Sequence, residues 1–318
     1  MSLRVAIQMD PVEAIDPERD STFVLALEAA KRGYALFHYL PCDLTLEGRR
    51  VTARASSLFV ERAAATPARL GPAEVIDLSS MDVVLMRQDP PFDMGYISAT
   101  HVLEYLQPYT LVVNDPVSVR NAPEKLFAAQ FDDLVPPTIV TSDREAMLAF
   151  RNEHHDVVVK PLYGNGGRGV FHIGPDDENF NVLIELFTAQ TREPIIVQRY
   201  LPRVRHGDKR IILIDGQPAG AMLRVPPKGE ARSNLHVGGI AAKAELDHRD
   251  HDICAAIGPT LREQGLVFVG IDVIGGFLTE VNVTSPTGLQ EVNRFDGVCL
   301  EARIWDAIEA KLLTREAV

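Results

Sequence analysis

Short apolar runs and stretches of helical periodicity alternate along the first part of the chain. Residues 3–8 form an apolar run that predicts a buried strand, and residues 35–40 form a second one. Between them, residues 21–32 carry apolar positions at helical spacing, so we expect a helix capped by Asp20 or Ser21. The pattern predicts a β-α-β opening.

This opening lacks the glycine pattern of a dinucleotide site. The first strand ends in Met9-Asp10-Pro11, and no Gly-x-Gly-x-x-Gly motif precedes the helix. Those glycines form the backbone cradle that a pyrophosphate needs at the start of the helix. A Rossmann-like shape here therefore need not bind NAD.

The pattern predicts further elements along the whole chain. Residues 49–60 alternate as in an antiparallel hairpin, and residues 96–106 are amphipathic. The first domain is expected to end near residue 120, and strand-rich segments are expected from residue 160 to 224. Other expected strands cover residues 81–86, 110–113, 138–140, 157–160, 267–274 and 278–283. Other expected helices cover residues 124–131, 143–152, 250–264 and the segment after Gly297.

One long stretch fits neither period. Residues 225–239 are rich in Gly, Pro and polar residues and show no helical or strand pattern. An irregular loop of this length is usually functional or mobile.

Composition and charge narrow the class of protein. The chain has 318 residues, 46% of them hydrophobic, enough for two or three domains with apolar cores. A formal net charge of −12 would repel nucleic acid and anionic lipid, so local cations must gather any anionic substrate. The three cysteines, Cys42, Cys254 and Cys299, are widely spaced, which favours a reducing compartment. No apolar run has the length of a membrane span, and the first strand is too short for a signal peptide, so we expect a cytoplasmic protein.

A glycine-rich segment follows a lysine at a strand end. Lys160 closes one predicted strand, and Gly164, Gly166 and Gly167 follow before another strand-like run. A Walker P-loop is excluded, because it needs Gly-Lys-Ser/Thr at the start of a helix. The exposed N–H groups of a glycine-rich hairpin can approach phosphate oxygens, and an ordinary tight hairpin is the alternative.

Other polar positions become candidates for nucleotide binding when they are considered together with this hairpin. Lys125 falls in the first turn of a predicted helix with Asn121 as a plausible cap, where a cation is unfavourable unless it faces an anion. Arg210 stands at the start of an apolar strand, where a guanidinium can stabilise charge on a transferring phosphoryl group. Residues 198–202 could offer backbone groups to an adenine edge, and Asp208 could accept from a ribose hydroxyl. The alternatives are a solvated lysine and a plain connection with solvated charges.

The most informative positions lie in a predicted hairpin near residue 275. Glu280 and Asn282 are two apart in a strand, so their side chains share one face. Asp272 joins that face if residues 275–277 form a three-residue turn, whereas a two-residue Gly-Gly turn puts it on the other face. Oxygen ligands without His or Cys suit Mg²⁺ held jointly with nucleotide phosphates. A charged edge pair is the alternative, and the metal interpretation requires the longer turn.

Taken in chain order, these positions resemble the ATP-grasp superfamily and, more narrowly, bacterial glutathione synthetase. The similar segments are Met9-Asp10-Pro11, residues 85–93, Glu124-Lys125-Leu126-Phe127, Asp208-Lys209-Arg210 and residues 282–287. The resemblance runs essentially end to end and implies an α/β (α+β) ATP-grasp fold with an N-terminal Rossmann-like pre-ATP-grasp domain. The implied domains are a substrate domain over residues 1–120, a central subdomain over 121–200 and a C-terminal subdomain over 201–318. A homo-oligomer is implied, either a dimer or the homotetramer that is common in the family.

The resemblance also implies roles for individual residues. ATP would be held by Lys125, Lys160, Gly164, Gly166, Gly167, Gln198, Arg199, Tyr200, Leu201 and Asp208. Two Mg²⁺ ions, for which Mn²⁺ can substitute, would be held by Asp272, Glu280 and Asn282. Arg210 would act at the reacting centre, and residues 225–240 would form a mobile lid with Arg232, Asn234 and Gly239 as its working residues. The substrate peptide would be bound by Arg87, Ser285, Pro286 and Thr287.

The reaction that the resemblance implies is glutathione synthesis. A γ-glutamylcysteine carboxylate attacks the γ-phosphate of ATP, the amine of glycine attacks the resulting acyl phosphate, and ADP and phosphate are released. Gln88, Ile240 and Gln290 are neutral where the family pattern has cations. Either other cations replace them, or a different amino acid or peptide is joined. The candidate replacements are Arg168, Arg199, His236 and Arg294. A phosphotransferase or a non-catalytic nucleotide-binding scaffold is a further alternative.

Overall fold

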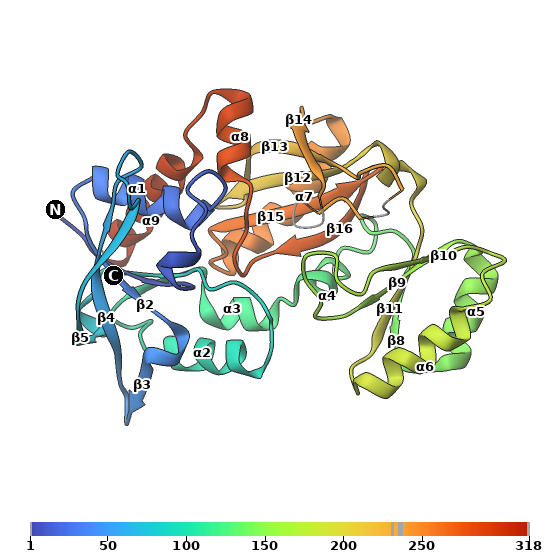
Figure 1. Ribbon diagram of the computed structural model, residues 1–318, viewed down its shortest axis with the longest axis horizontal. Helices are drawn as coiled ribbons and strands as arrows, with labels where there is room; N and C mark the ends of the chain where they lie inside the picture. Colours follow the sequence, from blue (N-terminus) through green and yellow to red (C-terminus); the bar gives the residue numbers. More distant parts are fainter. Residues whose placement is uncertain (1, 230–231, 235–237, 317–318) are drawn as a thin grey trace.

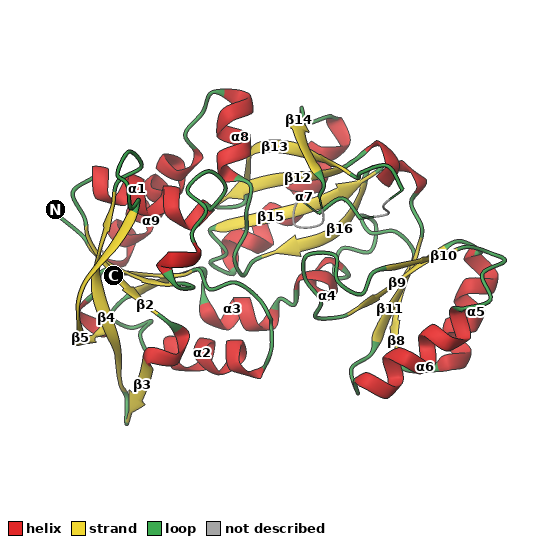
Figure 2. Cartoon of the chain, viewed as in Figure 1, coloured by secondary structure: helices red, strands yellow, loops and turns green. Residues whose placement is uncertain are grey.

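The computed structural model describes residues 2–229, 232–234 and 238–316. Its strands form an N-terminal, a central and a C-terminal sheet. In Figure 1 the N-terminal sheet lies on the left, the C-terminal sheet at the top centre and the central sheet on the right. All three sheets have helices beside their strands (Figure 2), and this mixed architecture confirms the expected α/β (α+β) class.

The N-terminal sheet combines parallel and antiparallel strands in the order β3-β4-β2-β1-β6-β7, with β5 beside β4. Its strands are β1 (Arg4–Gln8), β2 (Ala35–Tyr39), β3 (Leu44–Glu47), β4 (Arg50–Val60), β5 (Ala68–Asp77), β6 (Val83–Met86) and β7 (Leu111–Val113). Its helices are α1 (Ser21–Lys31), α2 (Met94–Glu104) and α3 (Pro116–Asn121). The β-α-β opening is confirmed, and Asp20 is the cap of α1, because its carboxylate accepts from the Phe23 N–H at 2.8 Å.

The hairpin expected over residues 49–60 is wrong, because these residues form the single strand β4. It pairs antiparallel with β2, β3 and β5. The alternation comes from one buried face, to which Val51, Ala53 and Ala55 contribute. The turn falls earlier, at Gly48, whose φ of 63° favours glycine.

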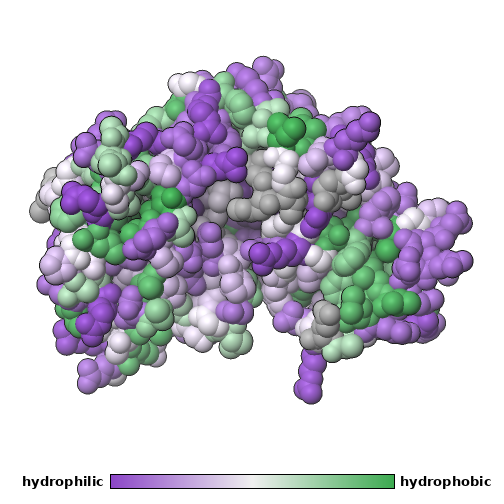
Figure 3. Space-filling model, viewed as in Figure 1, coloured by the Kyte–Doolittle hydropathy of each residue, from purple (hydrophilic) through white to green (hydrophobic). Residues whose placement is uncertain are grey.

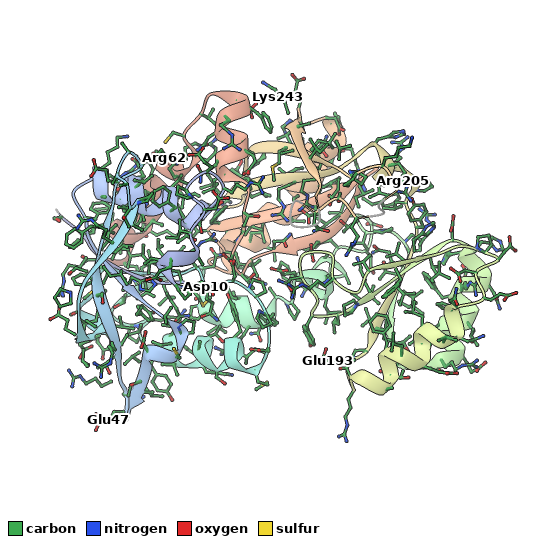
Figure 4. All side chains as sticks on the ribbon, in the orientation of Figure 1. Asp10, Glu47, Arg62, Glu193, Arg205 and Lys243 are labelled. Carbon is green, nitrogen blue, oxygen red and sulfur yellow. The ribbon has the colours of Figure 1, made fainter. Side chains whose placement is uncertain are left out.

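The strand order reverses at β1, because β2 and β6 lie on opposite sides of it. β1 pairs in parallel with β2 on one side and with β6 on the other. Such a reversal opens a crevice at the carboxyl ends of the two strands, where ligands commonly bind. Asp10, just beyond β1, lies towards the middle of the molecule, whereas Glu47 lies at its outer tip (Figure 4).

The central sheet is antiparallel, in the order β10-β9-β11-β8. Its elements are β8 (Thr138–Thr141), α5 (Arg144–His154), β9 (Val157–Pro161), β10 (Phe171–Ile173), α6 (Phe180–Gln190) and β11 (Ile195–Arg199). Helix α6 interrupts the segment expected to be strand-rich. Its Phe180 and Ile184 are buried against the sheet, whereas Val182 and Leu186 are exposed. Figure 3 shows a hydrophobic area on this lobe and a notch between it and the rest of the molecule.

The C-terminal sheet has the order β14-β13-β12-β15-β16. Its strands are β12 (Asp208–Ile214), β13 (Gln217–Val225), β14 (Ile240–Lys243), β15 (Phe268–Ile274) and β16 (Phe277–Asn282). The accompanying helices are α4 (Glu124–Ala128), α7 (His248–Glu263), α8 (Leu289–Asp296) and α9 (Leu300–Glu316). Among the described residues, no helix has both the length and the apolar character that crossing a membrane requires.

The N-terminal and C-terminal sheets share their apolar cores. One core contains Val84 with Ile211, and another contains Leu85 with Ile212 and Trp305. The central sheet instead packs a core of its own. Trp305 of α9 is fully buried, and its indole Nε1 donates to the Leu25 carbonyl of α1 at 2.9 Å.

Asn114 adds a polar link between these two sheets. Its amide nitrogen donates to the carbonyls of Phe268 and Val283, each at 2.8 Å, and its amide oxygen accepts from the Phe268 N–H at 2.9 Å. The end of β7 is thereby tied to β15 and to the end of β16. Both strands carry predicted site residues.

Candidate active site

The glycine-rich segment forms the predicted hairpin between β9 and β10, which pair antiparallel. The loop between them spans residues 162–170, so it is not an ordinary tight turn. Gly166 and Gly167 have φ values of 60° and 77°, which other residues adopt rarely. A Cβ on Gly167 would lie 2.6 Å from the Asn234 side-chain oxygen. Glycine thus lets the hairpin approach the predicted lid.

Most residues predicted to bind ATP or metal line one cavity, which lies between the central and C-terminal sheets. These are Lys125, Lys160, Gly164, Gly166, Gly167, Gln198, Arg199, Tyr200, Leu201, Asp208, Asp272 and Glu280. Arg232 and Asn234 also line it. In the described part of the chain, the lining omits Arg210, Asn282, Gly239 and the predicted peptide-binding residues.

Of the two predicted lysines at this cavity, Lys160 is buried and Lys125 is half-buried. Lys160 is 9% exposed and its Nζ donates to the Gln198 side-chain oxygen at 3.1 Å. Burial, together with the charge of Lys125, lowers the pKa of Lys160 to about 8. Lys125 donates to the Gly164 carbonyl and lies 3.7 Å from a carboxylate oxygen of Glu280. The solvated-lysine alternative is therefore wrong for Lys125.

The predicted cap of the helix that carries Lys125 is also wrong. Asn121 ends α3, and Pro123 precedes α4 without a side-chain cap. The proline fixes φ and so defines the helix start, whereas Asn121 already belongs to the preceding helical turn.

The segment after β11 packs through its side chains. The Arg199 guanidinium lies 5.6 Å from the Phe277 ring centre, and the Tyr200 ring stacks on His172 at 3.9 Å. These contacts fix the backbone of residues 198–201 beside the cavity. The arrangement is more than a plain connection, and it can offer backbone groups to a planar base.

A buried arginine that we did not predict joins two of the predicted acids. Arg224 of β13 pairs with Asp208 and, at 2.8 Å, with Asp272. Asp208 also accepts from the Ser233 hydroxyl at 2.9 Å, but its second oxygen is buried without a hydrogen-bond partner among the described residues. Burial raises the pKa of Asp208, although Arg224 opposes this shift. In the sequence, Arg224 was marked only by its place among apolar strand residues.

Arg210 holds Asp272 with two hydrogen bonds. Its Nε and Nη2 donate to the two carboxylate oxygens at 2.5 and 3.1 Å. Burial alone would raise the pKa of Asp272, but the charges of Arg210 and Arg224 hold it well below its usual range. Arg210 Nη1 also reaches the Thr287 carbonyl at 3.4 Å. The side chain therefore stands between the acids and the predicted peptide loop.

The turn between β15 and β16 is the two-residue alternative, but Asp272 does not lie on the face that this turn alone predicts. It has two residues, Gly275 and Gly276, and Ile274 pairs with Phe277. The required three-residue turn is therefore wrong. A β-bulge follows, at which the register shifts so that Asp272 nevertheless pairs with Glu280. The same-face geometry thus arises from a bulge that the turn residues do not reveal.

The donor set on this face fits a hard divalent cation. Asn282 lies near Asp272, with its amide nitrogen 3.5 Å from a carboxylate oxygen. Burial raises the pKa of Glu280 to about 7, although Lys125 opposes the shift, which indicates a shortage of positive charge. Within the described residues, no group of three or more His, Cys, Asp or Glu side chains is placed to hold a metal ion. Two carboxylates and an amide suit an ion that completes its shell with phosphate oxygens.

The predicted peptide-binding residues meet at the end of β6. Arg87 donates to the Thr22 hydroxyl at 3.0 Å and to the Pro286 carbonyl at 2.9 Å. The Ser285 hydroxyl donates to the Arg87 carbonyl at 3.2 Å. The loop that contains Thr287 is therefore anchored to the N-terminal sheet.

The predicted lid connects β13 and β14. Arg232 donates to the Gly167 carbonyl at 3.4 Å, and the Gly239 N–H donates to the Asn234 carbonyl at 3.1 Å. A Cβ on Gly239 would lie 2.0 Å from the Ser233 carbonyl oxygen, so only glycine fits there. His236 lies outside the described residues.

The three neutral positions occupy different surroundings. Gln88 accepts from the Gln8 side chain, and Ile240 is 64% exposed at the start of β14. Gln290 accepts from Arg62 at 2.9 Å. Arg62 is a nearby cation that we did not predict, since only the fold brings the β4–β5 loop to α8. Arg294 binds the Glu18 carbonyl in the same region.

The fold is that of ATP-grasp proteins, and a family model for an ATP-grasp domain matches residues 124–297 of the chain. D-cycloserine synthetase DcsG superimposes with a TM-score of 0.67 at 19% identity, covering 97% of this chain and 99% of that one. The ATP-grasp ligase PsnB, bound to a precursor variant, Mg and ADP, gives a TM-score of 0.66 at 17% identity, covering 98% and 99%. At such identities these likenesses concern the fold alone.

Sequence comparison narrows this class to one family. The model "Prokaryotic glutathione synthetase, N-terminal domain" matches residues 3–120, and "Prokaryotic glutathione synthetase, ATP-grasp domain" matches residues 124–297. The glutathione synthetases of Mesorhizobium japonicum and Brucella melitensis are 54% and 53% identical, covering 98% of this chain and 99% and 100% of theirs. That of Escherichia coli is 41% identical, with 98% and 99% covered. The chain belongs to the prokaryotic glutathione synthetase family of ATP-grasp ligases, ADP-forming enzymes that use ATP and a divalent metal.

Proposed function

We propose that this chain joins γ-glutamylcysteine and glycine into glutathione with cleavage of ATP to ADP and phosphate. The observation that carries the proposal is the identity of more than half with glutathione synthetases across 98% of the chain. The cavity supports it, because the predicted nucleotide residues converge there from two sheets. We also propose the division at residues 120 and 200 into a substrate domain and two ATP-grasp subdomains.

The residues of the cavity divide the task of binding ATP. The backbone of residues 198–201 would hold the adenine edge, and Asp208 the ribose hydroxyls. Lys125, Lys160 and the N–H groups of the glycine hairpin would face the phosphates. Burial and the charge of Lys125 lower the pKa of Lys160. The negative charge of a bound nucleotide would favour the protonated lysine.

Asp272, Glu280 and Asn282 would hold two Mg²⁺ ions, with Mn²⁺ as a substitute. When bound, such ions would neutralise negative charge on the phosphates. Arg224 and Arg210 fix the Asp272 carboxylate, while the bulge in β16 turns Glu280 towards the same face. Residue geometry thus prepares the site before the ions arrive.

Arg210 would stabilise the reacting centre. The peptide carboxylate attacks the γ-phosphate and ADP departs; the amine of glycine then attacks the acyl carbon, loses a proton and expels phosphate. Charge develops on phosphoryl and tetrahedral oxygens in these steps, and the Arg210 guanidinium is buried between the metal hairpin and the Thr287 carbonyl. The lid residues Arg232, Asn234 and Gly239 would exclude water from the acyl phosphate.

A second candidate is an ATP-grasp ligase that joins a different amino acid or peptide. The observation that favours it is the neutrality of Gln88, Ile240 and Gln290. A charge-assisted hydrogen bond contributes about 1.5 to 3 kcal/mol, so a missing cation must be replaced if the substrate is to remain the same. Arg62, which donates to Gln290, is a cation that the structure places there, and Arg294 lies in the same region.

The test is phosphate release from MgATP with γ-glutamylcysteine and each amino acid in turn. Glycine-dependent release, with glutathione identified by mass, supports the proposal, and Asp272→Ala/Glu280→Ala should abolish it. Release with another acceptor only supports the second candidate. ADP formation without free phosphate would instead indicate a phosphotransferase. We further propose a cytoplasmic homotetramer with small-molecule substrates, which cell fractionation and light scattering would test.

A further inference from the structure

The central sheet is joined to the rest of the chain by two segments, residues 129–137 before β8 and residues 200–207 after β11. The first segment touches the β15–β16 hairpin, which carries the proposed metal ligands. Its Leu134 carbonyl accepts from the Leu278 N–H at 2.8 Å. Leu278 lies two residues before Glu280 and next to the bulge. This contact therefore supports β16 close to a metal ligand.

The β15–β16 hairpin needs such support, because β16 is the last strand of its sheet. Its ladder hydrogen bonds go to β15, and the outer backbone groups of an edge strand have no partner in the sheet. The tip of the hairpin lies on the side of the C-terminal sheet that faces the central sheet (Figure 1). The connections of the central sheet can therefore fix the position of this tip.

The second segment packs on the turn of the same hairpin. A Cβ on Gly275 would lie 2.9 Å from the Arg203 Cδ, so the stem of the Arg203 side chain lies against this glycine. Just before the segment, the Arg199 guanidinium lies 5.6 Å from the Phe277 ring centre. Both connections of the central sheet thus meet at one turn.

Arg249 of α7 ties the first segment to this turn. Its Nε donates to the Gly276 carbonyl at 3.0 Å, and its Nη2 donates to the Asp133 carbonyl at 3.2 Å. Asp133 immediately precedes Leu134, so this bridge lies beside the contact between Leu134 and Leu278. In the part of the chain that the structure describes, no carboxylate pairs with Arg249. Its guanidinium therefore joins two backbone segments and does not neutralise an acid.

Arg249 projects from a rigid base. The Asp247 carboxylate accepts from the Asp250 N–H at 3.0 Å, and the Asp250 carboxylate accepts in return from the Asp247 N–H at 2.9 Å, which forms a capping box at the start of α7. Lys209 of β12 pairs with both carboxylates and so fastens this helix end to the C-terminal sheet. A cation in the first turn of a helix is unfavourable against the helix dipole. The stability of α7 itself therefore does not explain an arginine at position 249.

We propose that Arg249 is a positioning residue that holds the tip of the β15–β16 hairpin against the connection to the central sheet and so keeps the metal ligands in register with Lys160. Lys160 lies on β9 of the central sheet, whereas Glu280 and Asn282 lie on β16. Phosphates bound between these groups require a fixed separation of the two sides. Arg249 is not part of the described cavity lining, so it acts through the hairpin. The inference rests on the proposed function, because it takes the polar residues of β16 as metal ligands.

The test measures metal binding directly as well as turnover. Electron paramagnetic resonance gives the Kd for Mn²⁺ in the presence of ADP, and steady-state kinetics give the Mg²⁺ dependence of phosphate release. Arg249→Met should raise the Kd for Mn²⁺ about three- to tenfold, which is part of the roughly ten- to one-hundredfold effect of losing a charge-assisted hydrogen bond. Arg249→Lys keeps the charge and should show a smaller effect. Excess Mg²⁺ should restore kcat, which would not occur after a general loss of stability.

The matched control is Arg262→Met, on the same helix. Arg262 Nε donates to the Asp215 carbonyl at 3.2 Å, in the turn between β12 and β13. This turn is at the end of β12 opposite to the connection with the central sheet. Arg262→Met should therefore leave the Kd for Mn²⁺ unchanged.

Unchanged Mn²⁺ affinity in Arg249→Met, or an equal loss in Arg262→Met, would overturn the assignment. Failure of the wild type to bind Mn²⁺ with ADP would instead overturn the proposed metal site, and this inference with it. Phosphate release only with an acceptor other than glycine would overturn glutathione synthesis alone, because Mn²⁺ binding with ADP requires no acceptor.

Discussion

Replacing Arg224 by methionine tests whether one buried arginine holds the acids of the cavity together. Arg224 is 4% exposed and pairs with both Asp208 and Asp272. Methionine keeps much of the side-chain volume but removes the charge, so two buried carboxylates face each other without it. Arg210 still holds Asp272 in the variant, which leaves Asp208 as the group that suffers most.

The expected loss is large at neutral pH and smaller in acid. Removing one partner of a buried ion pair costs about 3 to 5 kcal/mol in the free energy of unfolding. The pKa of Asp208 is already raised by burial, and Arg224 opposes that shift, so the variant raises it further. A carboxyl group with a raised pKa in the folded state destabilises the fold above that pKa, and protonation relieves the penalty. The deficit of the variant should therefore shrink as the pH falls from 7 to 5.

Urea denaturation followed by the fluorescence of Trp305, the single tryptophan, measures this deficit. Trp305 is buried between α9 and α1 and so reports on the shared core. Arg54→Met, at an exposed position of β4, is the matched control and should change stability little. Adding Asp208→Asn to the variant should restore part of the loss. A deficit below about 1 kcal/mol, or one that is the same at pH 7 and pH 5, would refute the reasoning.

Three further predictions concern nucleotide binding and turnover. Because burial lowers the pKa of Lys160 to about 8, calorimetry should show ATP affinity falling as the pH rises above 8, and Lys160→Arg should remove most of that fall. Gly167→Ala should lower kcat/KM for ATP at least about tenfold, because its φ of 77° and the Asn234 oxygen at 2.6 Å exclude a Cβ; unchanged kinetics would show that the lid does not close there. Insertion of one alanine after Thr279, at the bulge, should put Glu280 opposite Ile271 and so on the other face, and metal-dependent phosphate release should vanish while the far-ultraviolet circular dichroism is kept.

The parts of the site that are formed by contiguous residues could be predicted from the sequence. Lys160 and the glycines that follow it could be predicted because strand, lysine and loop are contiguous. Asp20 could be predicted as a cap because capping depends on residue type at a helix start. The burial of Lys125 could not be predicted from its own segment, because Gly164 and Glu280, which contact it, come from other elements.

The remainder depends on where separate segments meet. Arg224 matters because β13 lies beside β12, which brings it to Asp208 and Asp272. The bulge in β16 places Glu280 on the same face as Asp272. The two turn glycines do not predict this bulge. Helix α6 is so rich in apolar residues that composition did not separate it from strand. Arg62 reaches Gln290 only because two loops far apart in the chain converge.

The shared cores have a consequence for how this chain can be divided. The N-terminal sheet ends at residue 113, and the N-terminal family model ends at residue 120. Apolar residues before and after this boundary nevertheless pack into the same two cores. Expressed alone, residues 1–120 would expose Leu85 and their share of both cores to water, and should aggregate. The central lobe packs around itself, so residues 136–200 form the segment best suited to folding in isolation. The N-terminal and C-terminal sheets thus form one structural unit, and the central sheet forms a second. The cavity lies between these two units.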